Sequence, residues 1–292
     1  MKWENQRESD NVEDRRGAPG GGLPLLGGRL GLGTVVVVLA VGWLLGINPM
    51  TLLGVLEGAD SSVMTQQGAE SPAARPPADD TMARFVSVVL ADTEDVWKDV
   101  FAKGGGRYQE PHLVLFRGST PTSCGQGQAA MGPFYCPGDQ KVYIDLGFYE
   151  TLRNQLGAPG DFAQAYVIAH EVGHHVQNLL GISQRLDEQR GRLSKAQYNA
   201  LSVRLELQAD CLAGVWAHHA DRSRQILERG DVEEAMNAAA RIGDDALQRA
   251  SGGAVVPETF THGTSEQRQR WFATGLKQGT VRGCDTFSAS PL

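Results

Sequence analysis

The apolar positions of this chain form one uninterrupted run near the N-terminus, followed by a series of periodic segments. No residue from 30 to 56 carries a charge, and residues 35–41 within this stretch are all apolar. A helix of about 20 residues covers about 30 Å, the thickness of the hydrocarbon core of a bilayer. Asn48 and Pro49 come next, and a proline here would end such a helix. We therefore expect residues 30–47 to form a transmembrane helix; a buried helix of a soluble domain fits less well, because the run is apolar on every face.

The charges on either side of this run predict its orientation. Arg15, Arg16 and Arg29 precede it, whereas Glu57 and Asp60 follow it. By the positive-inside rule, residues 1–29 are then a flexible cytoplasmic tail without a packed core, and the C-terminal part lies outside the cytoplasm. The run is longer than the apolar region of most cleaved signal peptides, which favours an uncleaved signal anchor, although cleavage stays open.

The periodic segments begin near residue 80, after a Pro/Ala-rich tether that we assign to residues 48–79. Apolar residues at helical spacing predict a helix from Asp80 to Gly104. Residues 112–116 read as a strand, and residues 141–146 alternate as in a half-buried strand. The second strand is either an ordinary sheet strand or an edge strand to which an extended peptide can add.

Four more helices are predicted by apolar stripes and capping residues. The first starts with Asp161 as its N-cap and stops at Gly181. The second begins with the capping box Ser194-x-x-Gln197, and another follows over residues 231–250. The last begins with Thr264-x-x-Gln267 and ends at Gly279. Few strands beside many helices indicate an α+β fold for a single domain over residues 80–292.

Composition and charge exclude some classes of protein. The apolar content of 41% argues against a disordered protein. The formal charge is −7, and Lys and Arg do not gather into a stripe. Nucleic acid is therefore not an expected partner.

The four cysteines suit an oxidising compartment, because an even count in an extracytoplasmic domain suggests disulfides. Cys124 and Cys136 bracket a short Gly-rich segment, so we favour a local bridge between them. Cys211 would then pair with Cys284. A cysteine zinc site is the alternative, but the chain has no Cys-x-x-Cys spacing to support it.

The segment expected to be a helix from Asp161 contains the pattern His-Glu-x-x-His at residues 170–174. Residues four apart lie on one face of a helix, so His170 and His174 can both offer ring nitrogens to one zinc ion. Glu171 lies beside them, where a carboxylate can take a proton from zinc-activated water. The alternative is a polar helix face with two surface histidines.

A catalytic zinc site needs a third protein ligand, and Glu206 on the following helix is our choice. Asp210 lies one turn later on the same face, where it can hold a ligand imidazole by a hydrogen bond. The alternative is a solvated carboxylate pair. His175, His218 and His219 are interpreted as structural or surface residues.

The chain resembles the bacterial neutral zinc metallopeptidases of the YpfJ type. The likeness runs from Trp3 and residues 7–16 (Arg-Glu-Ser-Asp-Asn-Val-Glu-Asp-Arg-Arg), through residues 132–137 (Gly-Pro-Phe-Tyr-Cys-Pro), to the His motif. The zinc residues are also similar to those of gluzincins, in which Glu-x-x-x-Asp follows His-Glu-x-x-His. His262 and Arg268 resemble a later His…Arg element of that group that supports the transition state, although Gly263 stands where a proline often follows the His.

The resemblance implies peptidase chemistry, with a peptide or protein as substrate. Together with the apolar run and the histidine motif, it predicts a membrane-anchored peptidase with a zincin-like domain and one Zn²⁺. Glu171 would act as the general base, and His262 and Arg268 would donate hydrogen bonds to the developing oxyanion. The alternative from another class is a catalytically inactive, membrane-tethered scaffold that retains a structural zinc site.

Overall fold

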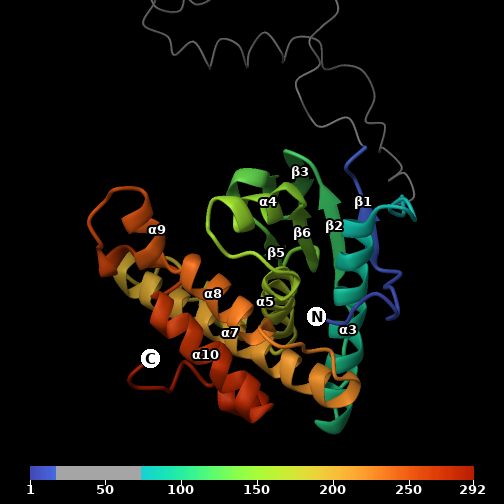
Figure 1. The fold of residues 1–292 in the computed structure, drawn as a ribbon. Helices are drawn as coiled ribbons and strands as arrows, with labels where there is room; N and C mark the ends of the chain where they lie inside the picture. Colours follow the sequence, from blue (N-terminus) through green and yellow to red (C-terminus); the bar gives the residue numbers. More distant parts are fainter. Residues whose placement is uncertain (18–73) are drawn as a thin grey trace, which may run out of the picture. The chain divides into compact units, whose positions relative to one another are not determined.

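The computed structural model describes residues 1–17 and 74–292, which form an α+β domain (Figure 1). Strands dominate its first half, whose elements in chain order are β1 (Val12–Asp14), α3 (Thr81–Lys103), β2 (His112–Phe116), β3 (Ser119–Thr122), β4 (Gly125–Gln128), β5 (Phe134–Cys136), β6 (Lys141–Asp145) and α4 (Gly147–Asn154). The second half is helical and comprises α5 (Asp161–Leu179), α6 (Ile182–Asp187), α7 (Lys195–Arg224), α8 (Asp231–Arg241), α9 (Asp244–Ala250) and α10 (Ser265–Gln278).

The main sheet has the strand order β1-β2-β6-β5. β1 and β6 both run parallel to β2, and β5 closes the sheet antiparallel to β6. The strand predicted over residues 141–146 is therefore present, but as an interior strand paired on both sides. Its interpretation as an edge strand is wrong, and β5 takes that position.

The faces of β2 and β6 pack against different layers because side chains alternate along a strand. Leu113, Leu115, Val142 and Ile144 join the main core with α3 and α5. Val114 and Tyr143 point the other way, into a small cluster with Phe134. β3 and β4 form a separate hairpin.

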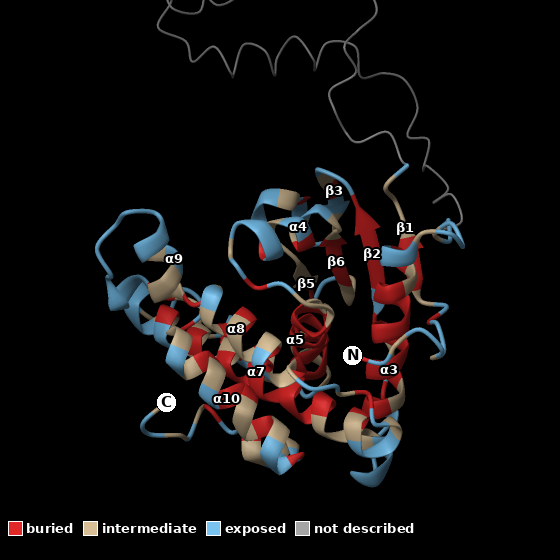
Figure 2. Cartoon of the chain, viewed as in Figure 1, coloured by how far each residue is buried: buried red, intermediate tan, exposed pale blue. Residues whose placement is uncertain are grey.

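Helix α5 lies at the centre of the domain, with the sheet and α3 on one side and α7 and α8 on the other (Figure 1). Figure 2 shows that it is buried over most of its length. A helix packed on so many sides is held rigidly, which suits an element that positions functional side chains.

Local capping signals give most helix ends as predicted. Asp80 accepts from the N–H of Ala83 at the start of α3, and both predicted capping boxes, at Ser194 and Thr264, are complete. Asp161 differs from the prediction, because it is the first residue of α5 and its side chain caps nothing. The predicted helix over residues 231–250 is broken into α8 and α9.

Both predicted disulfides are present. Cys124 pairs with Cys136 at the end of β5, and Cys211 on α7 pairs with Cys284 near the C-terminus. The first fixes the loop before β5 to the sheet, and the second fixes the C-terminal segment to α7.

Residues 1–17 differ from the prediction of a tail without a packed core. β1 extends the sheet, and Val12 is 5% exposed against the main core. The signal anchor predicted over residues 30–47 and most of the tether lie outside the described residues. In residues 1–17 and 74–292, no helix combines the length and the apolar character needed to cross a membrane.

Candidate metal centre

The site begins where α5 crosses α7. Gly173 lies inside the His-Glu-x-x-His motif, and a Cβ placed there would be 3.0 Å from the carbonyl oxygen of Ala209. The absence of a side chain thus permits close backbone approach. It brings the motif of α5 against the segment of α7 that carries Glu206 and Asp210.

His170, His174 and Glu206 meet at this crossing. The Oε2 atom of Glu206 lies 3.2 Å from Nε2 of His170 and 3.5 Å from Nε2 of His174. Three donors that each lie about 2.1 Å from one ion in tetrahedral geometry are roughly 3.4 Å apart. Two imidazole nitrogens and a carboxylate are also zinc's usual donors in catalytic sites. The three predicted ligands therefore fit Zn²⁺ in both spacing and chemistry.

The ring of His170 is oriented by a buried hydrogen-bond network. Its Nδ1 lies 2.8 Å from Oδ1 of Asp210, the role predicted for that carboxylate. Tyr166, one turn earlier on α5, donates to the same oxygen at 2.5 Å. Burial disfavours a charged ring, but Asp210 and Glu206 outweigh it and raise the pKa of the metal-free His170 to about 10. The only sequence signal for Tyr166 is its position four residues before His170.

Arg268 is placed behind this network. Its guanidinium donates twice to Asp210, at 2.8 and 2.9 Å, and once to the carbonyl of Ile242. The residue is 2% exposed, so its donors are directed at protein acceptors. This geometry favours a role in holding Asp210 over the predicted donation to a substrate oxyanion.

His174 has an orienting partner that the sequence reading missed. Its Nδ1 lies 2.8 Å from Oε1 of Gln177, three residues later on α5. The amide nitrogen of Gln177 is itself fixed by donation to the carbonyl of Leu205. Each of these two histidines thus uses Nδ1 for a protein contact and leaves Nε2 available to a metal ion.

His262 lies in the wall of the same cleft and is held by Asp244, at the start of α9. One oxygen of Asp244 accepts from the backbone N–H groups of Thr261, His262 and Gly263, and the other lies 3.4 Å from Nδ1 of His262. The hydrogen bond to Asp244 raises the pKa of His262. Gly263 adopts φ +91°, which a proline cannot, so the missing proline follows from this turn.

The ligands open into a cleft of about 1250 Å³. Glu171 lines it beside His170 and His174, and is 8% exposed. Apolar and aromatic side chains supply much of the remaining wall, among them Met131, Phe134, Phe148, Leu186, Tyr198 and Leu247. The cleft is large enough to take several residues of an extended peptide.

His175 connects α5 to β5, the edge strand beside the cleft. Its Nε2 lies 2.6 Å from the carbonyl of Gln109, and its Nδ1 lies 3.0 Å from the hydroxyl of Tyr135. Burial lowers the pKa of His175, so the ring is neutral and Tyr135 donates to Nδ1. This agrees with the structural role predicted for His175.

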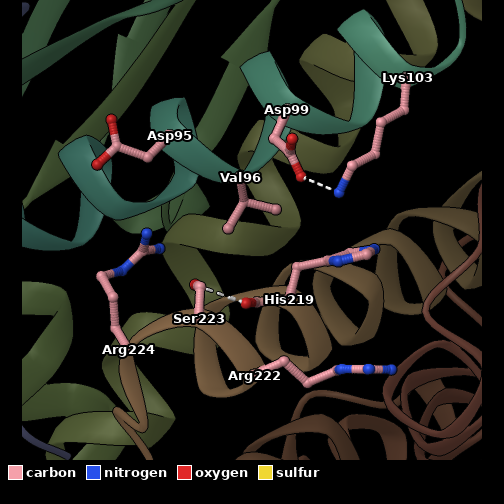
Figure 3. Close-up of a pocket in the computed structure, with 8 residues that line it drawn as sticks. All are labelled: Asp95, Val96, Asp99, Lys103, His219, Arg222, Ser223 and Arg224. Carbon is pink, nitrogen blue, oxygen red and sulfur yellow. Dashed lines mark hydrogen bonds and ion pairs between the residues drawn. The ribbon is translucent and has the colours of Figure 1, made fainter.

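A second, smaller hollow of about 430 Å³ lies between the ends of α3 and α7 (Figure 3). Most of its charged groups already have partners: Lys103 pairs with Asp99, and Arg224 pairs with Asp92. Ser223 donates to the carbonyl of His219, and His219 to that of Gly279. These contacts account for the side chains that make them without a ligand.

A family model described as "Putative neutral zinc metallopeptidase" matches residues 1–287 of the chain. The chain belongs to this family. The match includes the first 17 residues as well as the metal centre, and the family's name agrees with the donor set found at the crossing of α5 and α7.

Two relatives show how far the likeness extends. The Escherichia coli K12 protein named "Uncharacterized protein YpfJ" is 51% identical over 296 residues, covering 99% of this chain and all of the relative. A Mycobacterium tuberculosis H37Rv protein, "Uncharacterized protein Rv2575", is 43% identical over 223 residues, covering 72% of this chain and 73% of its own length. No solved structure matches the chain.

Proposed function

We propose that this protein is a zinc-dependent endopeptidase of the gluzincin type, with a zincin-like arrangement around α5 and α7. The observation that carries the proposal is the three-donor set of His170, His174 and Glu206, with Glu171 next to it in an open cleft. A purely structural zinc site has no use for that carboxylate and is normally closed by a fourth protein ligand.

Zinc bound here supplies a water of lowered pKa and polarises the scissile carbonyl. Glu171 accepts a proton from the attacking water as its oxygen adds to the carbonyl carbon. Glu171 then returns the proton to the leaving amine as the C–N bond breaks. Its position beside both histidines, at the wall of the cleft, supports this role.

His262 donates a hydrogen bond to the oxyanion that develops during attack. The Nδ1 atom of His262 lies 2.9 Å from the hydroxyl of Thr261 and 3.4 Å from Oδ1 of Asp244, so Nε2 remains for the substrate. A donor of this kind typically contributes about 3 kcal/mol to stabilisation of the transition state. Arg268 supports the site indirectly, through Asp210 and His170.

An extended substrate pairs with the free edge of β5. Phe134 and Tyr135 of this strand line the cleft, and the opposite side of β5 is occupied by β6. Backbone pairing gives affinity that depends little on sequence, while pockets for alternate side chains provide selectivity.

The test compares wild type with Glu171→Gln, using metal analysis and cleavage of a peptide library. Gln keeps the size of the side chain but cannot act as a base, so we expect full zinc occupancy with hydrolysis lost by at least about 100-fold. Glu150→Gln, on the exposed surface of α4, is the matched control and should cleave like wild type. Zinc binding without cleavage in the wild type, over the whole library, would instead support the inactive zinc-binding scaffold.

A further inference from the structure

One part of the cleft is lined by apolar side chains from four separate segments. Val167 lies three residues before His170 on α5, and Leu156 lies in the turn between α4 and α5. Ile242 follows the end of α8, and Leu247 lies on α9. We call these four cleft-lining side chains the apolar pocket. Val167 is 4% exposed and Leu247 is 40% exposed, so Val167 belongs to its floor and Leu247 to its mouth.

The apolar pocket adjoins the metal centre through Arg268. The guanidinium of Arg268 donates to the carbonyl of Ile242 at 3.2 Å, and it lies 3.4 Å from Nδ1 of His170. One planar group thus joins the backbone of the pocket to the ring of a predicted zinc ligand. Val167 is near His170 for a second reason, because residues three apart on a helix are neighbours on its surface. A substrate side chain in this pocket therefore belongs to a residue close to the scissile bond.

Hydrogen bonds fix the segments of the pocket relative to one another. Asn237 on α8 donates to the carbonyl of Gly157 at 2.9 Å, which holds the turn between α4 and α5 against α8. Asp244, two residues after Ile242, accepts from the backbone N–H of His262 at 2.6 Å. The pocket is thus a preformed part of the fold and lies next to the proposed oxyanion donor.

The side chains around the pocket select against charge. In the described part of the chain, the cleft-lining side chains from α4, the turn after it, the end of α8 and α9 are all uncharged. Arg268 is 2% exposed and directs its donors at Asp210 and Ile242. A charged substrate side chain would leave water here without gaining a partner, which is unfavourable. A bulky apolar side chain would instead bury apolar surface, which is favourable.

We propose that the apolar pocket takes the side chain of a substrate residue next to the scissile bond and selects bulky apolar residues such as leucine, with Leu247 as a specificity-determining residue. The substrate class is then extended peptides with such a residue at this position. This rests on the proposed peptidase function, because the metal centre defines where the scissile bond lies. One methylene group in a pocket of this kind changes selectivity by about 10- to 200-fold.

The test measures binding to the full-length, zinc-loaded protein by calorimetry, so it does not depend on hydrolysis. The probes are the hydroxamates of N-acetyl-leucine, N-acetyl-alanine and N-acetyl-glutamate, in which a zinc-chelating group stands next to one side chain. We expect the leucine probe to bind at least about 10-fold more tightly than the other two. Equal affinities, or no binding by any of the three, would overturn the proposal. A leucine preference in a protein that cleaves no peptide would refute the proposed hydrolysis and still support the pocket.

A matched pair of variants tests the role of Leu247. Leu247→Arg adds a charge at the mouth of the pocket and should weaken binding of the leucine probe by at least about 10-fold, without weakening that of the glutamate probe. Val256→Arg is the control, because Val256 is 41% exposed but is not among the side chains that line the cleft. The control should bind all three probes like wild type. Equal losses of leucine-probe affinity in the two variants would overturn the role of Leu247.

Discussion

Two charge networks join distant parts of this chain, and they differ in their access to water. At the metal centre, Asp210 and Arg268 are 0% and 2% exposed and connect α7 to α10. At the base of β1, the side chains of Asp14 and Arg16 are 11% and 13% exposed, and that of Asp80 is 26% exposed. The first network is inaccessible to solvent, whereas the second is partly exposed to it.

The difference in solvent access matches a difference in role: the first network positions a side chain of the candidate metal centre, and the second attaches β1 to the rest of the domain. A buried ion pair gains little over an apolar packing, but loss of one partner leaves a charge without solvation. Such a network fixes one geometry, which suits the orientation of a zinc ligand. Ion pairs that water reaches contribute less each, so β1 is held by several of them together with its backbone pairing.

The largest expected effect on stability comes from a substitution in the buried network of Asp210 and Arg268. Arg268→Met removes both donations to Asp210 while keeping much of the side-chain volume, so we expect the free energy of unfolding to fall by about 3–5 kcal/mol. The matched control is Arg270→Met on the same helix, whose side chain is 44% exposed and pairs with Glu266. Arg270→Met should lower the free energy of unfolding by less than about 1 kcal/mol. Urea denaturation of the zinc-loaded proteins measures both, and equal effects would remove the distinction between the two networks.

An intermediate effect is expected from one hydroxyl of the same network. Tyr166→Phe removes the donor at 2.5 Å from Asp210, and a hydrogen bond to a charged group contributes about 1.5–3 kcal/mol. Because Asp210 orients His170, zinc affinity should also fall, by roughly 10-fold.

Tyr149→Phe is the control for that substitution. Tyr149 is also buried, but its hydroxyl has no hydrogen-bond partner in the described part of the chain. Its removal leaves no group unpaired, so stability and zinc affinity should stay near those of wild type. A loss of zinc affinity in the control as large as in Tyr166→Phe would show that general packing, and not the contact with Asp210, affects the metal.

The meeting of His170, His174 and Glu206 and most helix ends could be predicted because their signals are local. The spacing of His170 and His174 fixes a shared helix face, and the capping boxes at Ser194 and Thr264 each lie within four residues. Glu206 was accessible through its spacing from Asp210 on a second helix. Both disulfides followed from the position of a short loop and the remaining pair.

The features that were missed depend on contacts between distant residues. β1 is three residues long and shows little alternation of apolar and polar residues. It pairs with a strand about 100 positions later, so its sequence resembles that of a polar tail. Strand order in the sheet is equally non-local, which is why the sequence left open whether β6 is an ordinary sheet strand or the edge strand. From the sequence, Arg268 could be expected to donate to a substrate, because its contact with Asp210 is known only from the structure.

The smallest expected effect is the release of β1 in acid. Burial opposes ionisation of Glu13, but hydrogen bonds from Lys141 and Arg15 outweigh it and lower the pKa of Glu13. The hydrogen bond from Arg16 lowers the pKa of Asp14. A carboxylate with a lowered pKa in the folded state stabilises attachment above its unfolded pKa, about 4, and this stabilisation is lost as pH falls through the folded value. We expect protection of the N–H of Arg15 against hydrogen exchange to fall below about pH 4, beyond the intrinsic pH dependence of exchange.

Glu13→Gln sharpens this prediction, because the amide cannot ionise. The variant should lose part of the protection at pH 7, by less than about 1 kcal/mol, and its protection should vary less between pH 5 and pH 3 than that of wild type. Glu8→Gln, at an exposed pair with Arg84, is the control and should follow wild type. Burial disfavours the charge of Asp210, but Arg268 and His170 outweigh it and lower its pKa to about 2. Asp210 therefore stays ionised at the pH at which β1 is released. If β1 and the segment around Asp210 lost protection at the same pH, the two networks would form one cooperative unit.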